Sequence, residues 1–325
     1  MTGIRLPDVD LSPARHGVVG SHRDRVAMTT LSLAARTGRI AAALPVAAAI
    51  AVTATVTADA TVTADTTVTA DATGVEPLDH AHAHNDYEHD RPLLDALDHG
   101  FTSVEADVWL VDGELLVAHD SWELDPERTL ESLYLDPLRD IVHANGGSVY
   151  PEWDGSLQLL IDIKNTGEAT YAEIHNTLRR YADIMTRITP GHAREGAVTA
   201  VISGDRPLQT MLSQRVRFAG YDGRLSDLDG GLPADFMPLV SDNWTRHFTW
   251  DGTGTMPAAE RARLQSIVER AHSAGYRVRF WATPDQPSAQ REAIWSELVA
   301  AGVDHLNTDD LPGLRDFLLS LAASR

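Results

Sequence analysis

Two carboxylates stand on the same face of one predicted strand. Apolar and acidic residues alternate along residues 103–109, which places Glu105 and Asp107 together on the face opposite the apolar side chains. Two neighbouring carboxylates repel each other unless a cation lies between them. Oxygen ligands suit a hard ion such as Mg²⁺ or Ca²⁺, which also binds phosphate oxygens. The pair therefore predicts a site for one divalent ion.

Histidines flank these carboxylates in the sequence. Asp112-Gly113 is a strong two-residue hairpin signal, and the turn would return His119 alongside the acidic pair. Imidazole titrates near neutral pH, so two histidines beside such an ion can act as general base and general acid on a phosphodiester. Three further histidines alternate along the strand at residues 78–83 and its end, and so share one face: His80, His82 and His84.

A second acidic strand follows at residues 157–163. Asp162 and Lys164 share one of its faces, and Lys164 is the one lysine among 27 basic side chains. A lysine retained where arginine is otherwise used indicates a site that needs a compact ammonium group. The alternative is a structural ion pair between Lys164 and Asp162.

The order of these motifs resembles a known family. His, Glu-x-Asp, His-Asp and a later Asp-x-Lys occur in this order in the glycerophosphodiester phosphodiesterase superfamily of phospholipase-C-like TIM barrels. The opening His-x-His-Asn-Asp-Tyr and the segment SVEADVWLVDGELLVAHD are most similar to a bacterial and fungal branch. That branch includes the fungal altered-inheritance-of-mitochondria proteins. The resemblance runs from about residue 78 to the C-terminus.

The resemblance implies roles for individual residues. Asp162 would be the third metal ligand, and Lys164 would contact a phosphate oxygen. The first catalytic histidine is His82 or His84, because the usual His-Arg-Gly is absent. Matching Asn85 to the sphingomyelinase D pattern favours His82, with His84 orienting it or binding metal. Family members usually carry Glu where this chain has Asp162, and Asp-x-Lys is similar to the sphingomyelinase D and phospholipase D branch.

Two later residues match substrate-binding positions of the superfamily. Trp281 ends the predicted strand in RFWATPD, where an aromatic side chain lines the substrate pocket of the superfamily. A core or rim tryptophan is an equally good interpretation. GVDHLNTDDLPGL resembles the closing strand and turn, which implies that Asn307 faces the barrel mouth.

The predicted elements indicate an α/β fold, a single-domain TIM (β/α)8 barrel over residues 77–325. Strands and helices alternate from residue 157 onward, which is typical of a parallel sheet. The eight predicted strands are 78–83, 103–109, 157–163, 197–202, 217–220, 237–240, 276–281 and 304–307. The site candidates fall at strand C-terminal ends, where TIM-barrel sites lie. A doubly wound sheet is the alternative, but no Gly-rich phosphate loop follows the first strand.

The N-terminal residues do not show a globular pattern. Residues 1–60 contain an apolar, Ala-rich run at 40–56 and then Ala58-Asp59-Ala60, a small-x-small pattern. This is typical of a signal peptide cleaved near Ala60, which predicts secretion. An uncleaved anchor is the alternative. Residues 61–76 repeat Thr, Ala and Asp and are predicted to be a linker.

Composition excludes several classes of partner and site. The 325 residues contain no cysteine, so disulfides, thiolate metal sites and a cysteine nucleophile are excluded. A formal net charge of −20 disfavours nucleic acid and anionic membranes. We therefore expect a small-molecule or lipid phosphodiester substrate, no nucleic acid and at most transient membrane contact, with the oligomeric state open.

These observations favour a divalent-metal-dependent phosphodiesterase that cleaves a glycerophosphodiester or a phospholipid head group. One alternative is a sphingomyelinase D/phospholipase D-like lyase that forms a cyclic phosphate. Another is a catalytically silent barrel that binds a phosphorylated ligand. A zinc-dependent amidohydrolase is disfavoured, because the predicted strands at 217–220 and 237–240 are not followed by histidine.

Overall fold

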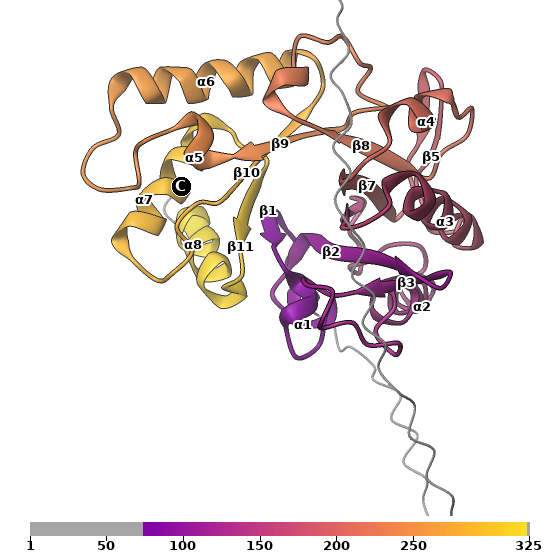
Figure 1. The fold of residues 1–325 in the computed structure, drawn as a ribbon. Coiled ribbons are helices and arrows are strands. Elements are labelled where there is room, and N and C mark those ends of the chain that lie inside the picture. Colours follow the sequence, from indigo (N-terminus) through magenta and orange to yellow (C-terminus); the bar gives the residue numbers. More distant parts are fainter. Residues whose placement is uncertain (1–73, 324–325) are drawn as a thin grey trace, which may run out of the picture. The chain divides into compact units, whose positions relative to one another are not determined.

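The computed structural model describes residues 74–323 (Figure 1). The predicted N-terminal extension, the signal peptide and nearly all of the linker therefore lie outside the described residues. Within residues 74–323, every helix is too short or too polar to cross a membrane.

Eight parallel strands close into a barrel. The first strand pairs in parallel with both its sequence neighbour and the last strand, which joins the two ends of the sheet. The barrel strands are β1 (Leu78–Ala83), β2 (Phe101–Val111), β4 (Leu157–Ile163), β7 (Val198–Gly204), β8 (Ala219–Gly223), β9 (Leu239–Asn243), β10 (Arg277–Trp281) and β11 (His305–Thr308). This order is that of an α/β TIM barrel, and the fold prediction is confirmed.

Helices alternate with these strands along the chain (Figure 1). They are α1 (Leu94–Asp98), α2 (Asp136–Ala144), α3 (Gly167–Arg180), α4 (Leu208–Ser213), α5 (Trp244–His247), α6 (Ala258–Ser273), α7 (Ala289–Ala301) and α8 (Leu311–Ala323). Shorter turns are η1 (Asp86–Glu88), η2 (Glu131–Leu135) and η3 (Leu225–Asp227), and a small antiparallel hairpin joins β5 (Arg187–Thr189) to β6 (His192–Arg194). Local sequence sets several ends: the Ser288 hydroxyl accepts the Arg291 N–H at the start of α7, and Gly302 ends that helix at φ 83°.

The barrel interior is layered. Its middle layer is a small apolar cluster of Leu160, Val201 and Leu239, each fully buried. On β4 the same strand face carries Gln158 before this layer and Asp162 after it. The interior is therefore polar at both ends of the strands and apolar between them.

A tight hairpin returns the chain to the barrel mouth. Asp112 and Gly113 adopt φ of 51° and 93°, as a type I′ turn requires. The following strand, β3 (Glu114–Val117), pairs antiparallel with the end of β2, so that Val117 lies opposite Val108. This pairing delivers His119 to the acidic strand, as the hairpin signal predicts.

A buried aspartate fixes the loop that follows β1. The Asp86 carboxylate accepts the backbone N–H of Leu93 at 2.6 Å, and both residues are fully buried. Leu93 adopts φ 64° and ψ −53°, a strained conformation for a side chain with a Cβ. The carboxylate holds this turn in place and thereby positions the intervening residues, including Tyr87.

Asp86→Asn is expected to gain stability relative to the native chain as the pH rises from about 4 to about 7. Burial raises the pKa of Asp86 from 3.8 to about 7, so the folded chain favours the protonated carboxyl. The protonated carboxyl stabilises the native chain fully below the pKa of Asp86 in the unfolded chain. This stabilisation is lost as the pH rises through the pKa of Asp86 in the folded chain, and the unfolding free energy changes by a few kcal/mol, on the order expected for such a shift. Urea unfolding of both chains across this range measures it. A pH-independent difference in unfolding free energy would contradict the expectation.

Candidate active site

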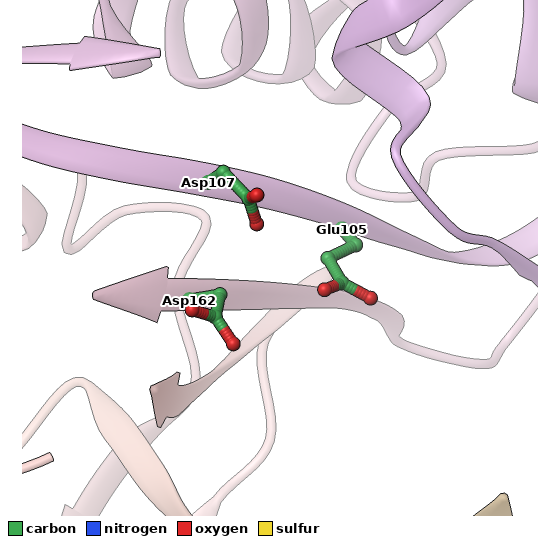
Figure 2. A group of neighbouring side chains, drawn as sticks. All are labelled: Glu105, Asp107 and Asp162. Atoms are coloured by element: carbon green, nitrogen blue, oxygen red, sulfur yellow. The ribbon is translucent and has the colours of Figure 1, made fainter. Parts of the chain in front are cut away.

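Three carboxylates meet at the C-terminal ends of two adjacent strands. Glu105 and Asp107 come from β2, and the strand register places Asp162 of β4 directly beside Asp107. One oxygen of each carboxylate lies within 4.8 Å of the others. Figure 2 shows the three side chains on the two neighbouring strands, all projecting to the same side. The structure thus brings together the three residues that the sequence predicts as metal ligands.

The carboxylate cluster fits a hard divalent cation. Asp107 Oδ1 is buried and has no hydrogen-bond partner among residues 74–323. Burial and the neighbouring Glu105 charge raise the pKa of Asp107 to about 6, which shows that the site is short of positive charge. Three carboxylates with an orphaned inner oxygen are a ligand set that suits Mg²⁺ or Ca²⁺.

Lys164 bridges two of these carboxylates. Its Nζ lies 2.8 Å from Asp107 Oδ2 and 3.1 Å from Asp162 Oδ1. The side chain is 24% exposed, so the ammonium group also reaches the mouth of the barrel. Burial alone would lower the pKa of Lys164, but the two carboxylates raise it, and the group stays charged. Lys164 is therefore both a structural ion-pair partner and a cation available to a bound anion.

His119 stands at the outer edge of the cluster. Its Nδ1 lies 3.3 Å from Asp107 Oδ2 and 3.1 Å from the hydroxyl of Tyr87, which itself donates to Asp107 Oδ2 at 2.6 Å. These partners orient the imidazole with Nδ1 inward, leaving Nε2 free to exchange a proton. The side chain is 51% exposed, so a substrate can reach it.

His82 is buried on the opposite side of the cluster. Its Nδ1 lies 2.7 Å from Ser103 Oγ, and its Nε2 lies 3.2 Å from Glu105 Oε2. Arg279 Nη1 contacts both groups, at 2.6 Å from Glu105 Oε2 and 2.5 Å from His82 Nε2. Burial and this guanidinium lower the pKa of His82 to about 3, so the imidazole is neutral. Donation from Nδ1 to Ser103 leaves Nε2 as the acceptor.

His84 has different partners from His82. Its Nδ1 lies 2.7 Å from Asp309 Oδ1, just beyond the end of β11. Burial alone would lower the pKa of His84, but the hydrogen bond to Asp309 together with the charges of Glu105 and Asp309 outweighs it, and the net shift is upward. The structure thus separates the two candidates for the first catalytic histidine, because His82 contacts Glu105 while His84 contacts Asp309.

The two predicted substrate contacts also lie at strand C-terminal ends. Trp281 is the last residue of β10 and is partly buried, with the Arg246 guanidinium 6.0 Å from its ring centre. Asn307 of β11 is paired in register with His82 and is buried, and its Oδ1 has no partner among the described residues. An unpaired amide oxygen beside His82 of β1 is suited to accept a hydroxyl group.

Two family models match the chain. The AIM6-like phosphodiesterase domain matches residues 67–222, which contain the three carboxylates, Lys164 and the histidines of the site. The Glycerophosphoryl diester phosphodiesterase family matches residues 277–312. The altered inheritance of mitochondria protein 6 homolog of Arthroderma benhamiae is 31% identical over 268 residues, covering 75% of this chain and 85% of that protein. The chain belongs to the AIM6 family.

Other relatives agree with this assignment. Altered inheritance of mitochondria protein 6 of Lachancea thermotolerans is 31% identical over 278 residues, covering 73% of this chain and 65% of that protein. A solved glycerophosphoryl diester phosphodiesterase from Parabacteroides distasonis aligns with 76% of this chain and 87% of its own at 13% identity and a TM-score of 0.43. Because this structural likeness is low, the fold assignment rests on the strand order of this AIM6-family chain itself.

Three residues that hydrogen-bond to the candidate site side chains of this AIM6-family chain were not predicted from the sequence. Arg279, Tyr87 and Ser103 hold Glu105, Asp107 and His82 respectively. A signal for Arg279 exists in the strand RVRFW, where arginines alternate onto the face that carries Trp281. Charged residues facing the inside of a barrel need partners there, and this rule identifies such arginines.

Arg279→Met is expected to destabilise the metal-free chain by about 3–5 kcal/mol, because Glu105 loses its buried cationic partner. Mg²⁺ or Ca²⁺ should stabilise this variant more than the native chain, since the ion supplies the missing positive charge. Thermal unfolding in EDTA and in each metal measures both effects. Equal metal stabilisation of variant and native chain would contradict this role of Arg279.

Proposed function

We propose that the protein is a divalent-metal-dependent phosphodiesterase acting on a glycerophosphodiester or a phospholipid head group. The observation that carries the proposal is the carboxylate cluster with its orphaned Asp107 oxygen, flanked by His82 on one side and His119 on the other. Membership of the AIM6 family, whose domain model is described as phosphodiesterase, supports the same reaction class.

The charges of the site match a phosphodiester. Three carboxylates and two cationic side chains, Lys164 and Arg279, leave one net negative charge. A bound divalent ion would reverse it to one positive charge. A phosphodiester carries one negative charge, so the loaded site is complementary to a diester and less well matched to a doubly charged monoester.

Each protein group then has a defined part in the reaction. A divalent ion held by Glu105, Asp107 and Asp162 would polarise a non-bridging phosphate oxygen. Lys164 adds a donor where negative charge develops. His82 is the candidate base: with Nδ1 donating to Ser103, Nε2 can take a proton once the attacking hydroxyl displaces Arg279 Nη1, which lies 2.5 Å from it.

His119 is the candidate acid. Asp107 and Tyr87 hold its Nδ1, so a protonated Nε2 can donate to the leaving alcohol oxygen. After the leaving group departs, His119 is neutral and His82 carries the proton taken from the attacking hydroxyl.

A second reaction is favoured by one specific residue. Asp162 stands where glycerophosphodiesterases usually carry Glu, and Asp-x-Lys is similar to the sphingomyelinase D and phospholipase D branch. In that case a hydroxyl of the substrate itself attacks phosphorus and a cyclic phosphate is released. The same His82 and His119 would serve both reactions.

The test compares bis(p-nitrophenyl) phosphate with p-nitrophenyl phosphate, using the full chain in the presence of Mg²⁺ or Ca²⁺. We expect the diester to be cleaved with the higher kcat/KM. Glycerophosphocholine and lysophosphatidylcholine are then followed by ³¹P NMR, which distinguishes an open monoester from a cyclic phosphate. Absence of turnover on all four compounds would reject the enzymatic proposal and leave the silent, ligand-binding barrel.

We further propose that the protein is secreted after cleavage near Ala60 and that its substrate is a small-molecule or lipid phosphodiester rather than nucleic acid. The support is the apolar run at residues 40–56, the small-x-small pattern that follows it and the net charge of −20. Mass spectrometry of the N-terminus of protein recovered from culture medium tests the cleavage. An intact residue 1 on cell-associated protein would contradict it.

A further inference from the structure

A cavity lies at the opposite end of the barrel from the carboxylates. It has a volume of about 640 Å³ and is lined by residues at the beginnings of five barrel strands, including His80, Thr102, Thr199, Arg277 and His305. The catalytic candidates lie at the ends of these strands, beyond the apolar layer of the interior. The residues that line the cavity differ from those of the proposed phosphodiesterase site, but the two adjoin, because the His305 ring centre lies 6.1 Å from that of His82.

His305 faces this cavity without a partner. Its side chain is only 2% exposed, and neither ring nitrogen has a hydrogen-bond partner among residues 74–323. Burial and the Arg277 charge hold the pKa of His305 well below its usual range, so the ring is neutral. It thus presents one N–H donor and one acceptor nitrogen, and leaving both unpaired costs free energy.

Arg277 lines the same cavity and lacks a counter-ion. Its guanidinium makes one hydrogen bond, from Nη2 to Gln158 Oε1 at 2.8 Å, and no carboxylate of the described residues lies within ion-pair distance. Burial lowers the pKa of Arg277, although the more distant charges of Asp304 and Glu195 oppose this shift. The other arginine of β10, Arg279, does have a carboxylate partner in Glu105.

The nearest acid is already occupied. Asp304 Oδ2 accepts the backbone N–H of Val278 at 2.7 Å and lies 2.9 Å from His272 Nε2. Gln158 holds one edge of the Arg277 guanidinium, and the Arg277 side chain lines the cavity. A partly buried guanidinium without a paired anion is unfavourable unless a ligand supplies the negative charge.

We propose that this cavity binds a small oxyanion, a carboxylate or a phosphate, which pairs with Arg277 and accepts the N–H of His305. Five carboxylates line the cavity. Asp79, Asp154 and Glu195 are exposed and screened by solvent, whereas Asp304 and Asp235 are half-buried. These negative charges disfavour large polyanions. The inference concerns binding at the N-terminal face and does not depend on the proposed phosphodiesterase reaction.

Calorimetric titration of the full chain in EDTA, with inorganic phosphate and separately with acetate, tests the proposal. The key variant is Arg277→Met, and the matched control is Lys164→Met, which removes the cation of the other site. We expect at least one anion to bind the native chain and Lys164→Met alike, with affinity reduced at least about tenfold in Arg277→Met. The tighter of the two anions identifies the ligand class. Binding of neither anion, or equal binding to Arg277→Met, would overturn the proposal.

A second pair of variants covers the case in which Arg277→Met does not fold. Ala193 lies on the exposed β5–β6 hairpin and lines the cavity, while the adjacent His192 is exposed and does not line it. Ala193→Trp should obstruct the cavity and weaken anion binding at least about tenfold, and His192→Trp should bind as the native chain does. Unchanged binding by Ala193→Trp would rule out the cavity as the site.

Discussion

His119→Ala is expected to lower kcat on glycerophosphocholine by about 10²- to 10⁴-fold, the usual contribution of a general acid. Half of this side chain is exposed, and its hydrogen-bond partners among residues 74–323 are Asp107 and Tyr87, so the fold should persist. The loss should be much smaller on bis(p-nitrophenyl) phosphate, because p-nitrophenolate leaves without a proton.

The comparison of the two leaving groups separates an acid from a residue that only supports the structure. His143→Ala is the matched control, since His143 is an exposed histidine paired with a surface aspartate, Asp183. It should leave both rates unchanged. Native turnover in His119→Ala, or an equal loss on both substrates, would remove His119 from the role of general acid.

Asp162→Asn is expected to weaken Mg²⁺ or Ca²⁺ binding by at least about 100-fold and to abolish most phosphodiester cleavage. The substitution removes one of three ligand charges while keeping the side-chain shape. Even the mutation of a residue that only hydrogen-bonds to a metal ligand typically lowers metal affinity by about 10- to 100-fold. The Asp162 side chain is partly exposed, and within the described part of the chain its ion-pair partner is Lys164 alone, so little stability depends on it. Calorimetric titration with each metal ion measures the affinity.

Two further variants sharpen this test. Asp183→Asn removes a surface carboxylate and should bind metal as the native chain does. Asp162→Glu restores the carboxylate that glycerophosphodiesterases usually carry and should recover part of the metal affinity. Native metal affinity in Asp162→Asn would show that the carboxylate cluster is not the ion site.

The strand pattern and the grouping of the three carboxylates followed from local sequence. The predicted ranges 78–83 and 157–163 coincide with β1 and β4, because alternation and burial together mark a barrel strand. Glu105, Asp107 and Asp162 could be placed together because the C-terminal ends of adjacent parallel strands share one edge. The hairpin at Asp112 explains why His119 was found as well.

Other features depend on contacts that local sequence does not specify. Arg279 meets Glu105 across 174 positions of sequence, and only barrel closure brings β10 to the site. Buried apolar residues continue past the end of α3 at Arg180, but they do not extend the helix: Met185 forms a bridge to Val198 instead of a further helical turn. The short β5–β6 hairpin is mostly exposed and lacks the burial pattern that marks a strand.

The hydrogen-bond network around Asp222, inside the barrel mouth, could not be predicted from the sequence either. Asp222 is fully buried and accepts hydrogen bonds from Ser203, Ser241 and Arg224, which belong to or follow three different strands. Each of these residues is unremarkable in sequence. Their common partner becomes visible only when the strand order and register are known.

The most direct measurement is the rate of bis(p-nitrophenyl) phosphate hydrolysis by the full chain after EDTA treatment, with Mg²⁺, Ca²⁺ or Zn²⁺ then added back. A metal-dependent phosphodiesterase built on three carboxylates should lose its activity in EDTA and regain it with Mg²⁺ or Ca²⁺. Activity that persists in full in EDTA, or that returns with Zn²⁺ alone, would contradict the proposed site.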